Sequence, residues 1–127
     1  MLAERRITPF IIDIAGTEVS AQERTVIEQL NPAGFILFAR NCESAEQVEA
    51  LCEDLHSLCP LDNKLIFIDE EGGRVSRIKF NPYKSPPMRR IGELYEKDPE
   101  EGLNAAKMNG YLLASQLMIY GITVDCA

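Results

Sequence analysis

The densest group of polar residues directly follows an apolar stretch of the chain. Residues 69–77 hold three consecutive carboxylates, then two glycines, then two arginines. A carboxylate at such a place can accept hydrogen bonds from two adjacent sugar hydroxyls, and an arginine can bind a carboxylate or carbonyl oxygen. Gly72 and Gly73 allow a sharp turn with close backbone approach. The pattern fits a sugar-binding loop, and it fits equally well a network of ion pairs that only shapes a turn.

Paired glycines can also cradle a phosphate group. Neither G-x-G-x-x-G nor G-x-x-x-x-G-K-[ST] occurs in the chain, and the acidic residues before Gly72 would repel an anion. Phosphate binding is therefore the weaker interpretation of this segment.

Other polar residues fall at or near the ends of predicted strands. Asp13 lies within an apolar run, Arg40 and Asn41 follow a second run, and Asp125 ends a later one. A hydrogen-bonded structural role competes with a functional one for Asp13, and loop anchoring competes with ligand binding for Arg40 and Asn41. The one histidine, His56, lies within a predicted helix, where we expect a solvent-facing or partly packed side chain and no catalytic role.

The four cysteines lack the C-x-x-C spacing of zinc and thioredoxin-like sites. They are Cys42, Cys52, Cys59 and Cys126. Cys52 and Cys59 fall on the predicted buried face of one helix. We expect reduced core thiols, typical of a cytoplasmic protein, and neither metal ligands nor disulfides.

These residues need strands to position them, and short apolar runs supply the strands. Runs at 10–16, 34–38 and 64–68 predict strands buried on both faces, and a fourth strand begins at 122. The third run is followed by a long loop with three prolines. Because parallel α/β folds bind ligands at the carboxyl ends of their strands, we expect residues 69–77 at that edge.

Three amphipathic helices are predicted between these strands. Capping-box spacings begin helices at Ser20 and Ser44, and Asp98 with the proline after it begins a third. These helices end near Leu30, before Pro60 and at Gly121. The buried stripe of the last helix is expected to consist of Leu103, Ala106, Gly110, Leu113, Leu117 and Tyr120.

The alternation of strands and helices predicts a parallel α/β sheet, either doubly wound or closed into a barrel. No linker or repeat interrupts the 127 residues, which we assign to one domain. A net charge of −7 without basic clusters argues against nucleic-acid binding. No apolar run approaches the roughly 20 residues that span a bilayer, and the N-terminus has no signal-peptide pattern. We therefore expect a cytoplasmic protein without a membrane segment.

Five segments of the sequence, at 13–16, 34–41, 68–77, 86–88 and 121–127, match one known family. They resemble the N-terminal domain of glycoside hydrolase family 3, in particular that of bacterial β-N-acetylhexosaminidases of peptidoglycan recycling. The resemblance covers nearly the whole chain, and its most specific part is D-[EQ]-E-G-G-R-V-x-R.

The resemblance implies the N-terminal half of a TIM (β/α)8 barrel, about three and a half βα units of a partial domain. It implies retaining hydrolysis of terminal β-linked N-acetylglucosamine from a saccharide or muropeptide, with no metal or other cofactor. Asp69 and Arg77 match substrate-binding positions. The residues expected to shape the loop are Glu71, Gly72, Gly73 and Arg74.

The same resemblance places the nucleophile on an aspartate of a late barrel strand and the acid/base on a histidine near a K-H-[FI]-P-G-H-G motif. Neither occurs in these 127 residues, so we expect no catalytic residue within the chain and no activity of the chain alone. A whole barrel takes about 250 residues. The exposed edges of a half barrel are expected to promote self-association. The alternatives are a non-catalytic sugar-binding or assembly module and an unrelated doubly wound binding domain.

Overall fold

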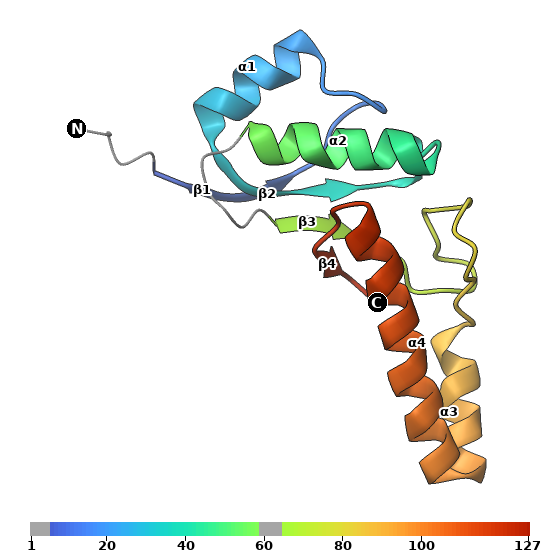
Figure 1. Cartoon of the computed structure of the whole chain (residues 1–127). Coiled ribbons are helices and arrows are strands. Elements are labelled where there is room, and N and C mark those ends of the chain that lie inside the picture. The colour runs from blue at the N-terminus through green and yellow to red at the C-terminus, as the bar shows by residue number, and fades with distance from the viewer. Residues whose placement is uncertain (1–5, 59–64) are drawn as a thin grey trace.

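Four parallel strands form one sheet in the order of the sequence (Figure 1). The computed structural model describes residues 6–58 and 65–127. The strands are β1 (Thr8–Ile12), β2 (Pro32–Leu37), β3 (Leu65–Ile68) and β4 (Val124–Asp125). A doubly wound binding domain would have its first strand in the centre. Because β1 lies at an edge, that alternative is wrong and the predicted barrel-type parallel order is confirmed.

The helices connect successive strands. They are α1 (Ala21–Leu30), α2 (Ala45–Ser57), α3 (Met88–Lys97) and α4 (Pro99–Ile119), with a short 3-10 turn, η1 (Ala39–Asn41). Helices α1 and α2 lie on the same side of the sheet, and the hairpin of α3 and α4 extends away from it (Figure 1). Among the described residues, no helix has the length and apolar character needed to cross a bilayer.

The core lies on one face of the sheet. Phe35 of β2 pairs in register with Ile66 of β3, and Leu37 pairs with Ile68; all four are fully buried. They form one cluster with residues of three helices: Ile27, Val48, Leu51, Cys52, Leu55 and Leu117. On the opposite face, Ile36 and its partner Phe67 are only half-buried. A sheet with its helices on one face is the arrangement found in the wall of a barrel, whose other face points inward.

Hydrogen bonds at the helix starts confirm the predicted capping boxes only in part. The Ser20 hydroxyl accepts a bond from the Glu23 amide, and the Glu23 carboxylate accepts one from the Ser20 amide. At α2 the Ser44 hydroxyl likewise accepts from the Gln47 amide, but the Gln47 side chain accepts from the amide of Glu43 instead. The second helix start therefore has the predicted N-cap without the complete box.

The first strand begins earlier in the sequence, and is more exposed, than predicted. The run 10–16 was expected to be a strand buried on both faces, but β1 ends at Ile12, and Phe10 is 57% exposed. An edge strand has one neighbour, so its side chains are less covered than those of a central strand. Residues 13–16 form a loop instead.

The last helices also differ from the prediction. Helix α3 occurs where a loop was expected. It has no buried residue and packs against α4. On α4 the predicted stripe is wrong at Leu103, Ala106 and Gly110, which are exposed, and right at Leu113, Leu117 and Tyr120. The buried face also includes Gly102, which packs against the backbone of Tyr95 in α3, and Asn109. The predicted roles of Cys59, Pro60 and Lys64 lie outside the described residues.

Candidate functional site

An ion pair lies at the carboxyl end of β3, where the sequence predicts a ligand site. Arg77 Nη2 contacts Asp69 Oδ2 at 3.0 Å, and the two side chains are 30% and 26% exposed. The second carboxylate oxygen of Asp69 has no hydrogen bond within the described part of the chain. Arg77 Nε is buried and has no partner among the described residues, so a ligand could meet only the Nη atoms. The part-exposed pair thus leaves Asp69 Oδ1 and Arg77 Nη1 without a partner among the described residues.

A buried carboxylate, Glu70, closes the loop that carries this pair. Its Oε2 accepts the backbone amides of Arg77 at 2.6 Å and Ile78 at 3.1 Å, and Glu70 is 4% exposed. The amide of Glu70 in turn donates to Asp125 Oδ1 of β4 at 2.9 Å. This role was not predicted from the sequence, where loop shaping was assigned to Glu71. Alternation along an extended chain was the available signal, since Glu70 continues the alternating burial of Ile66 and Ile68.

The two glycines form the tip of the loop with positive φ angles, +87° at Gly72 and +58° at Gly73. Gly72 and Val75 exchange backbone hydrogen bonds of 3.0 and 3.2 Å, and the Gly73 amide donates to Ser85 O at 3.1 Å. Glycine adopts such angles without strain, whereas most residues with a Cβ rarely do. The turn is therefore fixed both by its own bonds and by the segment at Ser85.

Glu71 and Arg74 are exposed, and neither forms an ion pair within residues 6–58 and 65–127. With Val75 and Met88 they border a small hollow of about 180 Å³ beside the turn. Their predicted loop-shaping role stays a prediction, because the bonds that shape the loop come from other residues.

Acidic side chains outnumber basic ones at the carboxyl ends of β3 and β4. Burial raises the pKa of Asp125, and the negative charges of Glu70 and Asp69 raise it further. Hydrogen bonds from the backbone amides of Glu70 and Cys126 lower it in part. Three carboxyl groups thus lie close together, and among the described residues only Asp69 is paired with a cation, Arg77; this disfavours an anion and suits neutral hydroxyls. No group of His, Cys, Asp or Glu side chains within the described ranges is placed to hold a metal ion.

Asp13, Arg40 and Asn41 meet at the ends of β1 and β2. The Arg40 guanidinium pairs with Asp13 and lies over the Phe38 ring, 4.8 Å from its centroid. Asn41 is fully buried; its Nδ2 donates to Ile14 O at 3.1 Å and Gly16 O at 2.7 Å, and its Oδ1 accepts the Phe38 amide at 2.8 Å. All polar atoms of that side-chain amide are occupied, which favours loop anchoring for Asn41.

The remaining candidates lie elsewhere. His56 Nε2 is 3.1 Å from Gly121 O, so it joins the end of α2 to the segment before β4, near the amino ends of the strands and away from Asp69 at the carboxyl end of β3. Cys42 and Cys52 are free thiols, and burial raises their pKa to about 11 and about 12. Neither is activated for chemistry.

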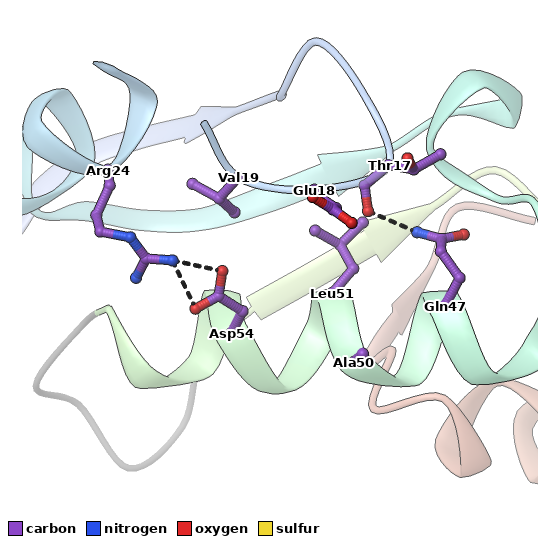
Figure 2. A pocket seen from close by; sticks show the side chains of 8 residues that line it. All are labelled: Thr17, Glu18, Val19, Arg24, Gln47, Ala50, Leu51 and Asp54. Atoms are coloured by element: carbon purple, nitrogen blue, oxygen red, sulfur yellow. Dashed lines mark hydrogen bonds and ion pairs between the residues drawn. The ribbon is translucent and has the colours of Figure 1, made fainter. Parts of the chain in front are cut away.

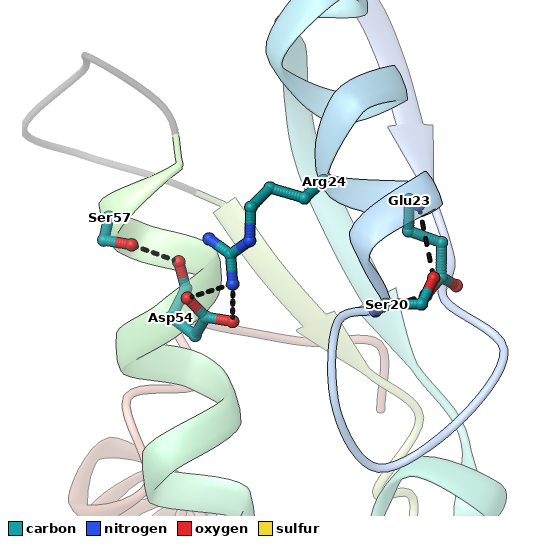
Figure 3. A network of polar contacts seen from close by, with 5 residues as sticks. All are labelled: Ser20, Glu23, Arg24, Asp54 and Ser57. Carbon is teal, nitrogen blue, oxygen red and sulfur yellow. Dashed lines mark hydrogen bonds and ion pairs between the residues drawn. The ribbon is translucent and has the colours of Figure 1, made fainter.

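A groove of about 430 Å³ lies between α1 and α2 (Figure 2). Three of its polar side chains are already paired: those of Gln47, Arg24 and Asp54. Gln47 Nε2 donates to Thr17 O at 2.7 Å, and Arg24 Nη2 contacts both carboxylate oxygens of Asp54 at 2.9 and 2.7 Å. Figure 3 shows this pair beside the Ser20–Glu23 cap, with Ser57 Oγ bonded to Asp54 O at 2.7 Å. The groove is larger than the hollow near Gly72, but its Arg24–Asp54 pair joins α1 to α2 and its Gln47 holds the loop before α1.

Known proteins resemble the chain in sequence and in structure. A "Beta-hexosaminidase" of Thiobacillus denitrificans is 39% identical over 121 residues, which is 94% of this chain and 33% of that protein. The chain spans about a third of the length of the curated relatives it matches. No protein-family model matches.

Two solved structures share the fold. NagZ from Neisseria gonorrhoeae, in complex with N-trifluoroacetyl-D-glucosamine, superposes with a TM-score of 0.84 at 31% identity, over 90% of this chain and 34% of NagZ. A glycoside hydrolase family 3 β-N-acetylglucosaminidase from Paenibacillus gives a TM-score of 0.79 at 28% identity, over 92% of this chain and 22% of that enzyme. These structures and the sequence relatives agree with the resemblance carried by the motifs of the sequence.

Proposed function

We propose that this chain, a relative of the β-hexosaminidases of glycoside hydrolase family 3, forms the sugar-holding side of a glycosidase that removes terminal β-linked N-acetylglucosamine. The observation that carries the proposal is the part-exposed Asp69–Arg77 pair at the carboxyl end of β3. A related structure holds an N-acylated glucosamine, which supports an N-acetylglucosamine-containing saccharide or muropeptide as ligand.

Each partner of the pair has a role in this proposal. Asp69 accepts hydrogen bonds from sugar hydroxyls through the oxygen that Arg77 leaves free. Arg77 fixes the carboxylate and offers its remaining Nη protons to a sugar oxygen. Gly72 and Gly73 carry no side chain that would obstruct the turn. Glu70 joins the two ends of the loop by accepting the backbone amides of Arg77 and Ile78.

The proposal does not make Asp69 the nucleophile. Retaining hydrolysis requires two groups on opposite sides of the scissile bond, one of them an acid/base. Neither Asp69, held by Arg77, nor the pair of Asp13 and Arg40 supplies such a second group. We propose that the bond-breaking residues lie outside these 127 residues, which then form a partial domain that is inactive alone.

Titration calorimetry of the folded chain with N-acetylglucosamine tests the sugar-holding role. Asp69→Asn keeps the shape and removes the charge, and we expect it to weaken binding roughly 10- to 100-fold, as for loss of a charged hydrogen bond of about 1.5–3 kcal/mol. Asp54→Asn is the matched control, because the Arg24–Asp54 pair has similar exposure, 39% and 33%, but lies on the outer helices. Equal binding by the Asp69 and Asp54 variants would refute the role.

A second measurement addresses the bond-breaking residues. We expect no release of p-nitrophenol from its N-acetyl-β-glucosaminide by the chain alone. Release that survives in Asp54→Asn and disappears in Asp69→Asn would show that the chemistry resides within these residues after all.

A further inference from the structure

Asn109 is a buried polar residue in the middle of α4, 5% exposed. Its Oδ1 accepts hydrogen bonds from Tyr83 Oη at 2.6 Å and from Ser85 Oγ at 2.8 Å. A buried amide is costly unless it is bonded, and both of these bonds reach the same segment of the long loop after β3. Asn109 therefore fixes residues 83–85 on the helix.

Ser85 and the residues after it lie directly against the glycine turn. Ser85 O accepts the Gly73 amide at 3.1 Å. A Cβ on Gly72 would lie 2.6 Å from Ser85 Oγ and 2.5 Å from Pro86 O, and one on Gly73 would lie 2.7 Å from Pro87 Cγ. Because no space separates the two segments, the position of Ser85 determines the position of the turn.

The glycine turn is connected to the ion pair by a few bonded residues. Gly72 is bridged to Val75, and two residues later Arg77 has its amide bound by Glu70 and its guanidinium on Asp69. A displacement at Ser85 would thus be passed along a short, bonded chain to the guanidinium.

A second residue, Tyr120 directly after α4, holds the same loop at residues 80–81, between the glycine turn and Ser85. The hydroxyl of Tyr120 donates to Asn81 Oδ1 at 2.8 Å, and the Phe80 ring packs edge-on against the Tyr120 ring at a centroid distance of 5.8 Å. The loop is therefore anchored at Asn81 as well as at Ser85, and Asn109 controls the end that touches the glycines.

We propose that Asn109 is a positioning residue for the sugar-holding loop, acting through Ser85 on the turn that carries Arg77. This inference rests on the proposed function for its ligand. Asn109 acts by accepting two hydroxyl protons, so an aspartate can replace it. A leucine of similar size removes this acceptor, which leaves Ser85 Oγ only the longer contact to Pro86 O at 3.2 Å.

The test compares Asn109→Leu and Asn109→Asp with Asn104→Leu, a control at an exposed position of the same helix. Amide hydrogen exchange reports the Gly73–Ser85 bond, and calorimetry reports affinity for N-acetylglucosamine. We expect Asn109→Leu to lower protection of the Gly73 amide about 10-fold and to weaken sugar binding by a similar factor, with core β2–β3 amides unchanged. Asn109→Asp at pH 7 restores both, and Asn104→Leu changes neither.

Unchanged Gly73 protection in Asn109→Leu overturns the inference, as does unchanged sugar affinity when protection is lost. If Asn109→Leu unfolds, Ser85→Ala removes one of the two bonds with less disruption and is expected to lower Gly73 protection in the same direction. If the wild-type chain binds no sugar, the proposed function fails, and Gly73 exchange alone then decides whether Asn109 holds the loop.

Discussion

Substitution of Gly72 by alanine gives the most direct test of how the loop is built. At φ +87° the new Cβ would stand 2.5 Å from Pro86 O and 2.8 Å from Ser85 O, both backbone atoms. Neither atom can turn aside as a flexible side chain would. The segment at 85–86 must therefore move, and the Gly73–Ser85 hydrogen bond must lengthen or break.

The expected cost follows from two contributions. An L-residue in the left-handed region costs about 1–2 kcal/mol. Loss of the hydrogen bond from Gly73 to Ser85 adds about 1 kcal/mol. The free energy of unfolding should therefore fall by about 2–3 kcal/mol, provided that the loop stays part of the cooperative unit.

Urea unfolding followed by circular dichroism measures this loss. Gly110→Ala is the matched control, because Gly110 lies within α4 and its Cβ would meet nothing within 4 Å. That substitution should stabilise the chain by up to about 1 kcal/mol, since alanine is the better helix former. A loss below about 0.5 kcal/mol for Gly72→Ala would refute the steric account of this turn.

Two further predictions concern titrating groups. Burial raises the pKa of Asp125, so between about 3.9 and its raised folded value the folded chain binds more protons than the unfolded chain, and stability falls as pH rises through that interval. Asp125→Asn should abolish that fall and be more stable at pH 7 in urea unfolding; equal pH dependence of the two proteins would contradict this. Among the described thiols, iodoacetamide at pH 8 should label exposed Cys126 before Cys42 or Cys52, whose high pKa leaves at most about one thiolate in a thousand. Peptide mapping that finds Cys52 first would contradict it.

The parts of the fold that could be predicted depend on local signals. Buried strands such as β2 and β3 are continuous apolar runs, and the Ser20 cap is a property of four consecutive residues. The exposure of β1 could not be predicted from its apolar run, because Phe10 and Ile11 are as apolar as core residues. Only the position of β1 at the sheet edge leaves them uncovered.

Helix α3 shows a different limit. Its apolar residues Met88, Ile91 and Leu94 recur every three positions, which was a usable signal, but three preceding prolines favoured a loop. The rotation of the α4 stripe has the same cause, since Gly102 is buried only because α3 packs against it. Because α3 was not predicted, the buried face of α4 was predicted wrongly as well.

At the candidate site, the residues that face solvent could be identified from the sequence, and those that hold them could not. Asp69 and Arg77 are eight residues apart and could be paired from chemistry alone. Glu70 is bonded to Asp125, 55 residues later, and Ser85 to Asn109, 24 residues later. Such partners share no local pattern, and their meeting depends on the parallel register of β3 and β4 and on the path of α4.

The loop after β3 is thus supported by its own hydrogen bonds and by two elements that come later in the chain. Asp125 of β4 holds the amide of Glu70, and α4 holds the proline-containing segment against the glycines. Packing of α4 and β4 onto the sheet must therefore precede or accompany ordering of the Asp69–Arg77 pair, because Glu70 alone closes only one side of the loop. A sugar that binds this pair would stabilise the packing of α4 and β4 as well as the loop, through the same bonds by which these elements position Arg77.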